Sequence, residues 1–334
     1  MGEMTRHAWD DRFVRAAGVE VPVICGAMYP CSNPELVAAV SEAGGLGVVQ
    51  PLSLSYVHGR DFLSGMRRIR ELTKKPVGLN VLTEKSLSKV YRERMERYVD
   101  EALEAGVRFF VTALGNPRWV VERVASSGGV VYHDCVDRKW AEKGLEGGVH
   151  GLIAVNDRAG GHAGRRPMEA LVEELSPLGV PVVCAGGIGD GAGFVKALSL
   201  GYAGVQMGTR FIATPECLVH ADYKEAIVKA GEEDVVLTER ITGVPVSVLR
   251  TPYVERVGTT AGPIGRFLLR GRTTKHWARA FYAIRSVRQL KVGLARSGSS
   301  SDYWQAGRSV AAIRSVEPAG EIVRSLAAAL ASAG

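Results

Sequence analysis

A histidine set among glycines near the middle of the chain is the residue whose type and surroundings best suit chemistry. The apolar residues 149–156 predict a buried strand, which runs directly into Gly160, Gly161, His162 and Gly164. Glycines allow backbone to approach a flat ligand, and imidazole is the side chain whose ordinary pKa suits proton exchange near neutral pH. The segment predicts a site at a strand mouth. A strand-to-helix loop carrying an incidental surface histidine is the alternative interpretation.

Two more glycine loops follow along the chain. One apolar run ends at Gly186 and Gly187, and the next ends at Gly208 and Thr209. Bare backbone N–H groups at a helix start, together with a threonine hydroxyl, would cradle a phosphate. Either loop alone is also consistent with a tight turn. Together with His162 on the preceding strand, the two loops predict a phosphate-bearing cofactor beside a proton-handling group.

The elements that must position these residues alternate as strand, loop and helix. Mostly continuous apolar runs predict eight parallel strands buried on both faces, at 21–28, 46–51, 77–82, 108–114, 130–136, 150–156, 181–187 and 204–211. Helices are expected between them, at 34–43, 59–72, 88–105, 117–126, 137–146, 167–175 and 191–200. Eight such units over about 230 residues match a TIM (β/α)8 barrel, whose chemistry lies in the loops after the strands. A doubly wound sheet fits less well, because the first strand lacks a GxGxxG turn.

Composition places the chain among ordinary globular proteins. Of its 334 residues, 46% are hydrophobic and 23% are charged. The apolar runs are too short to cross a bilayer and the first fifteen residues are polar, so we expect no membrane segment, no secretion signal and a cytoplasmic location. The five cysteines show neither CxxC spacing nor a His/Cys cluster, and we expect no disulfide framework and no metal site. Cys25 and Cys184 are predicted to be small buried hydrophobes.

The second half of the chain contains a strongly basic segment. Residues 250–296 carry eleven Lys and Arg against one Glu, a net +10 in a chain whose total is +7. Interleaved aromatic residues favour an acidic ligand, such as CoA, an acyl-carrier phosphopantetheine or the diphosphate of NAD(P)H. A solvated helix face is the alternative, and no nucleic-acid module is recognisable. We therefore divide the chain into a barrel at 1–213, a basic lid or excursion at 214–296, and a connector at 297–334. The connector leads into a C-terminal helix, 310–333, which we expect to pack on the barrel.

Several of these segments together resemble the nitronate monooxygenase family, formerly the 2-nitropropane dioxygenases. They are residues 26–28, 78–80, 159–164, 185–188, 206–211 and 304–308. The most specific element is the GGHxG loop, followed at the matching distance by AGGI and MGTRF. The family also includes FMN-dependent enoyl-ACP reductases and NADH:quinone reductases.

The resemblance implies an FMN-binding barrel in which His162 is the catalytic residue. The residues implied to bind the cofactor are Ala27, Met28 and Asn80 beside the isoalloxazine, Gly161 close to the ring, and Gly186, Gly187, Gly208 and Thr209 at the phosphate. Two of them also have simpler interpretations: Met28 as core packing and Asn80 as a loop cap.

The chain departs from the family's pattern at two strand ends. It has Cys25 where many members carry a glutamine, and Asp134 near the end of the fifth strand, where some carry a lysine. A lysine would offset negative charge on a reduced flavin, whereas an aspartate would oppose it. His133 is a candidate cationic substitute, although a supporting or surface position is the simpler expectation.

The resemblance favours oxidation of nitroalkanes or nitronates with O2 to carbonyl compounds and nitrite. An NAD(P)H-dependent enoyl-ACP or enoyl-CoA reductase, or a quinone reductase, is the alternative within the family. Two alternatives lie outside the family. One is a lyase or isomerase that binds a phosphate ligand without flavin, and the other is a flavin-binding sensor in which His162 is structural. The physiological substrate, the choice between NADH and NADPH and the oligomeric state stay open.

Overall fold

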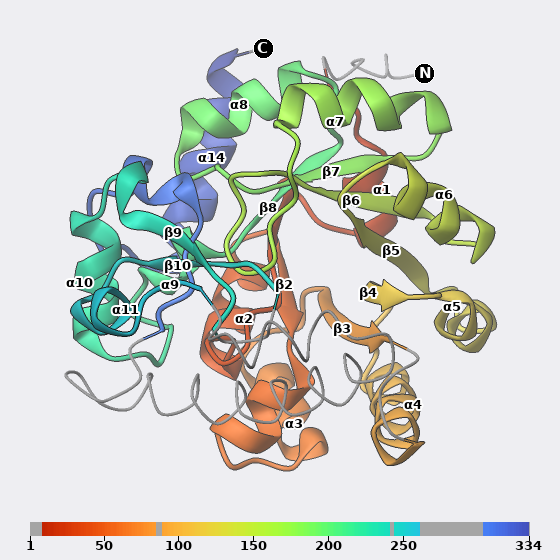
Figure 1. The fold of residues 1–334 in the computed structure, drawn as a ribbon. Coiled ribbons are helices and arrows are strands. Elements are labelled where there is room, and N and C mark those ends of the chain that lie inside the picture. Colours follow the sequence, from red (N-terminus) through yellow and green to blue (C-terminus); the bar gives the residue numbers. More distant parts are fainter. Residues whose placement is uncertain (1–8, 85–88, 241–243, 261–302, 334) are drawn as a thin grey trace.

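Eight parallel strands close into a barrel in the order β1 to β8 (Figure 1). The computed structural model describes residues 9–84, 89–240, 244–260 and 303–333. Cys25 on the first strand pairs with Met207 on the last, which closes the ring. The strands are β1 Val23–Cys25, β2 Leu46–Val49, β3 Val77–Thr83, β4 Phe109–Gly115, β5 Val130–Cys135, β6 Gly151–Val155, β7 Val182–Ala185 and β8 Gly204–Met207. The predicted TIM barrel is confirmed.

Helices cover the outside of the barrel. They are α2 Pro34–Glu42, α3 Phe62–Leu72, α4 Lys89–Glu104, α5 Arg118–Ala125, α6 Arg138–Glu146, α7 Met168–Leu175 and α8 Gly191–Ser199. Aspartate side chains cap three of them by accepting backbone N–H bonds, namely Asp61, Asp137 and Asp190. A π-helical turn, Ser53–Val57, and a 3-10 turn, Ser176–Leu178, fall outside the expected pattern. Within the described residues, no helix has the length and apolar character that a membrane crossing requires.

A short helix, α1 (Arg12–Ala17), closes the N-terminal end of the barrel. Its Phe13 is completely buried and packs edge-on against Phe109 of β4, with ring centroids 5.7 Å apart. Tyr132 of β5 lies 6.0 Å from the same ring. These aromatic side chains belong to an apolar cluster that fills the lower interior.

After β8 the chain leaves the barrel before its last covering helix. A four-residue helix, α9 (Thr209–Ile212), leads into a group of elements on one side of the molecule (Figure 1). That group contains α10 Ala221–Lys229, the 3-10 turn η3 Glu232–Asp234, the antiparallel strands β9 Val235–Thr238 and β10 Val246–Leu249, and α11 Pro252–Val257. The chain then returns through a 3-10 turn, η4 (Arg308–Ala312), and ends in α14 (Ala319–Ala333), which packs against α8 and α2. The last helix of the sequence therefore completes the barrel's outer layer.

Several predicted boundaries are wrong. The last helix starts at Ala319 and not at residue 310, because Pro318 lacks an N–H and instead accepts the first helical bond, from Ile322. The eighth strand ends at Met207, since Phe211 already belongs to α9. Residues 261–302, most of the basic segment and the serine-rich connector, lie outside the described residues.

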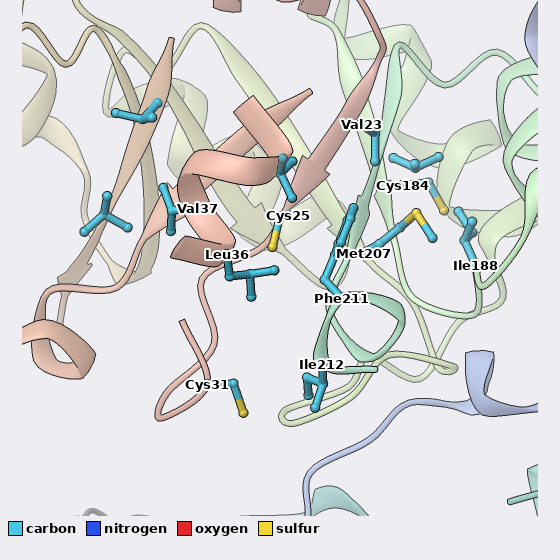
Figure 2. Close-up of a cluster of buried hydrophobic side chains, with 14 of the residues drawn as sticks. Val23, Cys25, Cys31, Leu36, Val37, Cys184, Ile188, Met207, Phe211 and Ile212 are labelled. Atoms are coloured by element: carbon cyan, nitrogen blue, oxygen red, sulfur yellow. The ribbon is translucent and has the colours of Figure 1, made fainter. Parts of the chain in front are cut away.

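The layer between strands and helices is apolar. Cys25 and Cys184 are completely buried in it, as expected for small hydrophobic side chains. Figure 2 shows Cys25 beside Leu36 of α2, with Met207 and Phe211 close by. This packing fixes the ends of β1 and β8, from which predicted cofactor residues extend.

Candidate active site

Asn156, which directly follows β6, joins two of the glycine loops. Its side chain is completely buried, and its Nδ2 donates to the carbonyl of Gly186 at 2.9 Å. Its Oδ1 accepts from the amide of Arg158 at 2.8 Å, and its backbone carbonyl accepts from Gly164 at 3.0 Å. Sequence reasoning missed this residue. The sequence offered one indication, a polar side chain at the end of an apolar run, next to glycines. A buried amide needs hydrogen-bond partners, and the neighbouring loops are where such partners would lie.

Gly186 and Gly187 occupy positions that only glycine fits. Their φ angles are 117° and 77°, in the left-handed region that L side chains avoid. A Cβ on Gly186 would lie 2.3 Å from Asn156 Oδ1, and one on Gly187 would lie 2.9 Å from the Arg158 side chain. The loop after β7 thus has the compact glycine backbone that a phosphate cradle requires.

The ends of β1 and β8 meet at the predicted cofactor site. A Cβ on Gly208 would lie 3.3 Å from the sulfur of Met28, so these two predicted residues are neighbours. Met28 and Ala27 are both half-buried. Thr209 is buried, and its Oγ1 accepts a hydrogen bond from the amide of Gly307 at 3.0 Å. Its hydroxyl proton can still be donated to a phosphate oxygen, because a hydroxyl both donates and accepts.

The C-terminal segment closes against the histidine loop, which the sequence did not reveal. Gly160 and Gly307 are so close that a Cβ on either would lie within 3 Å of the other's amide nitrogen. The amide of Ser247, on β10, donates to the carbonyl of Gly161 at 2.8 Å. Gln305 in turn forms a bridge with Val248 of β10. Two segments far away in the chain, β10 and residues 305–307, therefore hold the loop in place.

His162 lies at the mouth of the barrel on this loop. The side chain is solvent-exposed, yet the protein around it desolvates the imidazole and lowers its pKa, an effect that the Glu84 carboxylate partly opposes. The imidazole is thus predominantly neutral near pH 7. A neutral histidine with solvent access can accept a proton from a substrate at the mouth.

Polar side chains line the upper interior of the barrel. Asn80 lies within β3, only 8% exposed, and donates from Nδ2 to the carbonyl of Val111 at 3.4 Å. It is therefore an interior strand residue and not a loop cap. Gln206 of β8 also faces inward, since its side chain fills the space beside Gly26. These residues form a polar floor beneath the glycine loops.

His133 and Asp134 face opposite sides of β5. His133 packs on α6 outside the barrel, where its Nδ1 lies 2.9 Å from Thr112 Oγ1. Burial lowers the pKa of His133 to about 4, so this residue is not a substitute positive charge but takes a buried supporting position. Burial raises the pKa of Asp134 to about 7, so its carboxyl is substantially protonated at neutral pH.

A closed (β/α)8 barrel with glycine loops, polar side chains and a histidine at the C-terminal ends of its strands has the architecture typical of an enzyme. The model of one family, described as nitronate monooxygenase, matches residues 11–329, and the chain belongs to this family.

Individual relatives support the assignment. The chain is 27% identical to a (3aS,4S,5R,7aS)-5-hydroxy-7a-methyl-1-oxo-octahydro-1H-indene-4-carboxyl-CoA dehydrogenase of Mycobacterium tuberculosis, with 92% of each chain covered. It is 26% identical to a probable nitronate monooxygenase of Staphylococcus saprophyticus, over 72% of this chain and 78% of the relative. FabK from Thermotoga maritima has a TM-score of 0.79 at 28% identity, with 97% and 96% covered. The protein is therefore an oxidoreductase, which excludes the lyase and isomerase alternatives.

Proposed function

We propose that this protein is an FMN-dependent oxidoreductase that acts beside the carbonyl of an acyl thioester. FMN fits the site because the loop after β7 is a glycine cradle that any Cβ would fill. Gly186, Gly187, Gly208 and Thr209 would hold its phosphate. Ala27, Met28, Asn80 and Gly161 would contact the ring. FMN, when bound, supplies a hydride acceptor or donor next to the substrate.

The position of His162 carries the proposal: the residue is exposed on a glycine loop at the barrel mouth, and that loop is held in place by β10. Carbon next to a thioester carbonyl must lose a proton when the acyl chain is oxidised and must gain one when it is reduced. A neutral histidine has a free nitrogen that can accept the proton in the first step, and its protonated form delivers the proton in the second. The name of the Mycobacterium tuberculosis relative, a carboxyl-CoA dehydrogenase, supports the same substrate class.

The basic segment 250–296 suits the acidic part of such a substrate. CoA and phosphopantetheine both carry phosphate groups, and NAD(P)H carries a diphosphate. Arg250 and Arg256 are its two described cationic residues, and both are exposed. We propose the excursion after β8 as the region that binds this end of the ligand.

Nitroalkane oxidation is the second candidate, favoured by the family itself and by the Staphylococcus saprophyticus relative. A neutral nitroalkane also carries an acidic proton beside its reacting carbon, which His162 would remove. A nitronate has already lost that proton and does not need the base.

Anaerobic reduction of the FMN-loaded enzyme tests both candidates. We expect an acyl-CoA to bleach the flavin, and His162→Ala to slow bleaching about 100-fold while FMN stays bound. With a neutral nitroalkane, His162→Ala should slow bleaching by a similar factor. With a nitronate, it should slow bleaching much less.

His150→Ala is the matched control, because His150 is an exposed histidine immediately before the other end of the same strand. If nitronate bleaches the flavin and acyl-CoA does not, the enzyme is a nitronate oxidase and not an acyl-thioester oxidoreductase. If His162→Ala slows bleaching equally with neutral and deprotonated substrates, or does not slow it at all, proton transfer by His162 is excluded.

A further inference from the structure

A carboxyl group inside the barrel has an unused hydrogen-bonding atom. The Oδ1 of Asp134 is inaccessible to solvent, and it has no hydrogen-bond partner within the part of the chain that the structure describes. A buried polar atom without a partner lowers folding stability by roughly 1–3 kcal/mol, so such an atom in a folded protein usually has a functional reason. Asp134 therefore requires an explanation that packing does not supply.

The side chain of Asp134 points into the barrel. Tyr132, two residues earlier, belongs to the interior cluster, and side chains along a strand alternate between the two faces. His133 between them packs outside against Gly144 of α6. Asp134 is the last inward-facing residue of β5, at the barrel end that carries the glycine loops and His162.

Among the described residues, no cation offsets the burial of the Asp134 carboxylate. Ile153 of β6, in register with Asp134, is apolar. Below lies Tyr132, which burial keeps neutral by raising its pKa. The titratable neighbours in sequence, His133 and Cys135, project from the other face of the strand, where burial keeps both uncharged. Burial is accordingly the cause that raises the pKa of Asp134 to about 7.

A protonated carboxyl is both a donor and an acceptor, and in this position it needs an acceptor to which it can donate. The pyrimidine edge of an isoalloxazine presents carbonyl oxygens and ring nitrogens of that kind. We propose that Asp134 contacts the flavin as a neutral acid and donates a hydrogen bond to this edge. The inference rests on the proposed function, since it requires FMN in the barrel mouth.

The protonation state of Asp134 then sets the strength of flavin binding. In the neutral form the carboxyl supplies a donor to the ring. In the ionised form the donor is lost and a negative charge faces electronegative ring atoms, most unfavourably when the ring is reduced. FMN binding therefore favours the protonated residue.

The test is the affinity of the apoprotein for FMN between pH 6 and pH 8, followed by flavin fluorescence. In the unmodified protein we expect affinity to fall about tenfold, which is the drop in the protonated fraction for a pKa near 7. Asp134→Asn cannot ionise but keeps an N–H donor, so its affinity should be nearly constant over this range. Asp137→Asn, at the cap of α6, is the control and should behave like the unmodified protein.

Infrared difference spectra provide a second, direct readout of the carboxyl group. Addition of FMN at pH 7 should shift the band of a protonated carboxyl, and Asp134→Asn should remove that band. An equal pH dependence in the Asp134→Asn variant, or a carboxyl band indifferent to FMN, would overturn this inference and leave the proposed function standing. Failure of the unmodified protein to bind FMN at any pH would overturn both.

Discussion

The two ends of the barrel are built from the same eight strands but have opposite character. At the N-terminal end, Phe13 packs against Phe109 and Tyr132, and all three side chains are buried. At the C-terminal end, half-buried glycines and the exposed His162 surround the mouth. One end is a packed core, and the other is the proposed ligand site.

A single strand shows how the change occurs. On β5, Tyr132 belongs to the apolar lower layer of the interior, and Asp134, one inward position further along, belongs to the polar upper layer. Inward-facing residues of a (β/α)8 barrel form such layers, and the layer nearest the C-terminal ends carries chemistry. Stability and function are thus separated along the barrel axis, and substitutions at the two ends should have separable effects.

The largest expected effect is on stability, from a substitution at the closed end. Phe13→Ala would remove a completely buried aromatic ring and leave a cavity, which costs about 3–5 kcal/mol of unfolding free energy. Denaturant unfolding measures this loss. The affinity of the folded fraction for FMN should stay unchanged, because the site lies at the other end.

Leu63→Ala is the control for Phe13→Ala, since Leu63 is an exposed apolar residue on α3. It should change stability by less than about 0.5 kcal/mol. A Phe13→Ala protein that is stable, or that folds but has lost FMN affinity, would contradict the separation of the two ends.

The barrel could be predicted from the sequence because its signal is local. Continuous apolar runs mark strands buried on both faces, and glycines mark the loops that follow. The associations that complete the site are not local. Packing of the C-terminal helix on the barrel was expected, but the sequence did not specify that α14 would lie against α8 and α2. Nor did it specify that Gly307 would lie against Gly160.

The candidate site residues were predicted from residue type, and their surroundings could not be. His162 and the glycine loops were proposed because few other residues suit proton transfer or close backbone approach. The inward direction of Asp134 and the outward direction of His133 follow from strand register, which an apolar run of uncertain ends does not fix. Asn156 was missed because its partners come from two separate loops.

A substitution at the C-terminal end should lower FMN affinity and leave the fold stable, the reverse of Phe13→Ala. Gly208→Val would place a branched side chain beside Met28, in the space proposed for the phosphate. We expect FMN affinity to fall at least tenfold, with unfolding still cooperative, because the nearest atom is the flexible Met28 sulfur. Titration of the apoprotein with FMN measures the affinity.

The control for Gly208→Val is Gly193→Val on α8, where a Cβ would meet only ordinary contacts. It should leave FMN affinity unchanged. Full flavin occupancy in the Gly208→Val protein would show that the phosphate lies elsewhere.

The smallest expected effect is on the pH dependence of stability. It comes from His133 on the outer face of β5 and not from Asp134 on the inner face. His133 has a pKa of about 4 in the folded protein, below the ordinary 6.5, so the unfolded chain binds its proton first as pH falls. Stability from this residue is complete above pH 6.5 and is lost progressively toward pH 4. Between pH 7 and pH 5.5 the loss should be about 1 kcal/mol.

His133→Asn keeps a polar partner for Thr112 but removes the titration. The fall in unfolding free energy from pH 7 to pH 5.5 should therefore be about 1 kcal/mol smaller in this variant than in the unmodified protein. Asp134 has the opposite sign, because its raised pKa makes stability decrease as pH rises from about 4 to 7, but it is present in both proteins and cancels in the comparison. Equal falls in the two proteins would mean that His133 takes up its proton in the folded state. The outer face of β5 would then admit water that the packing against α6 is expected to exclude.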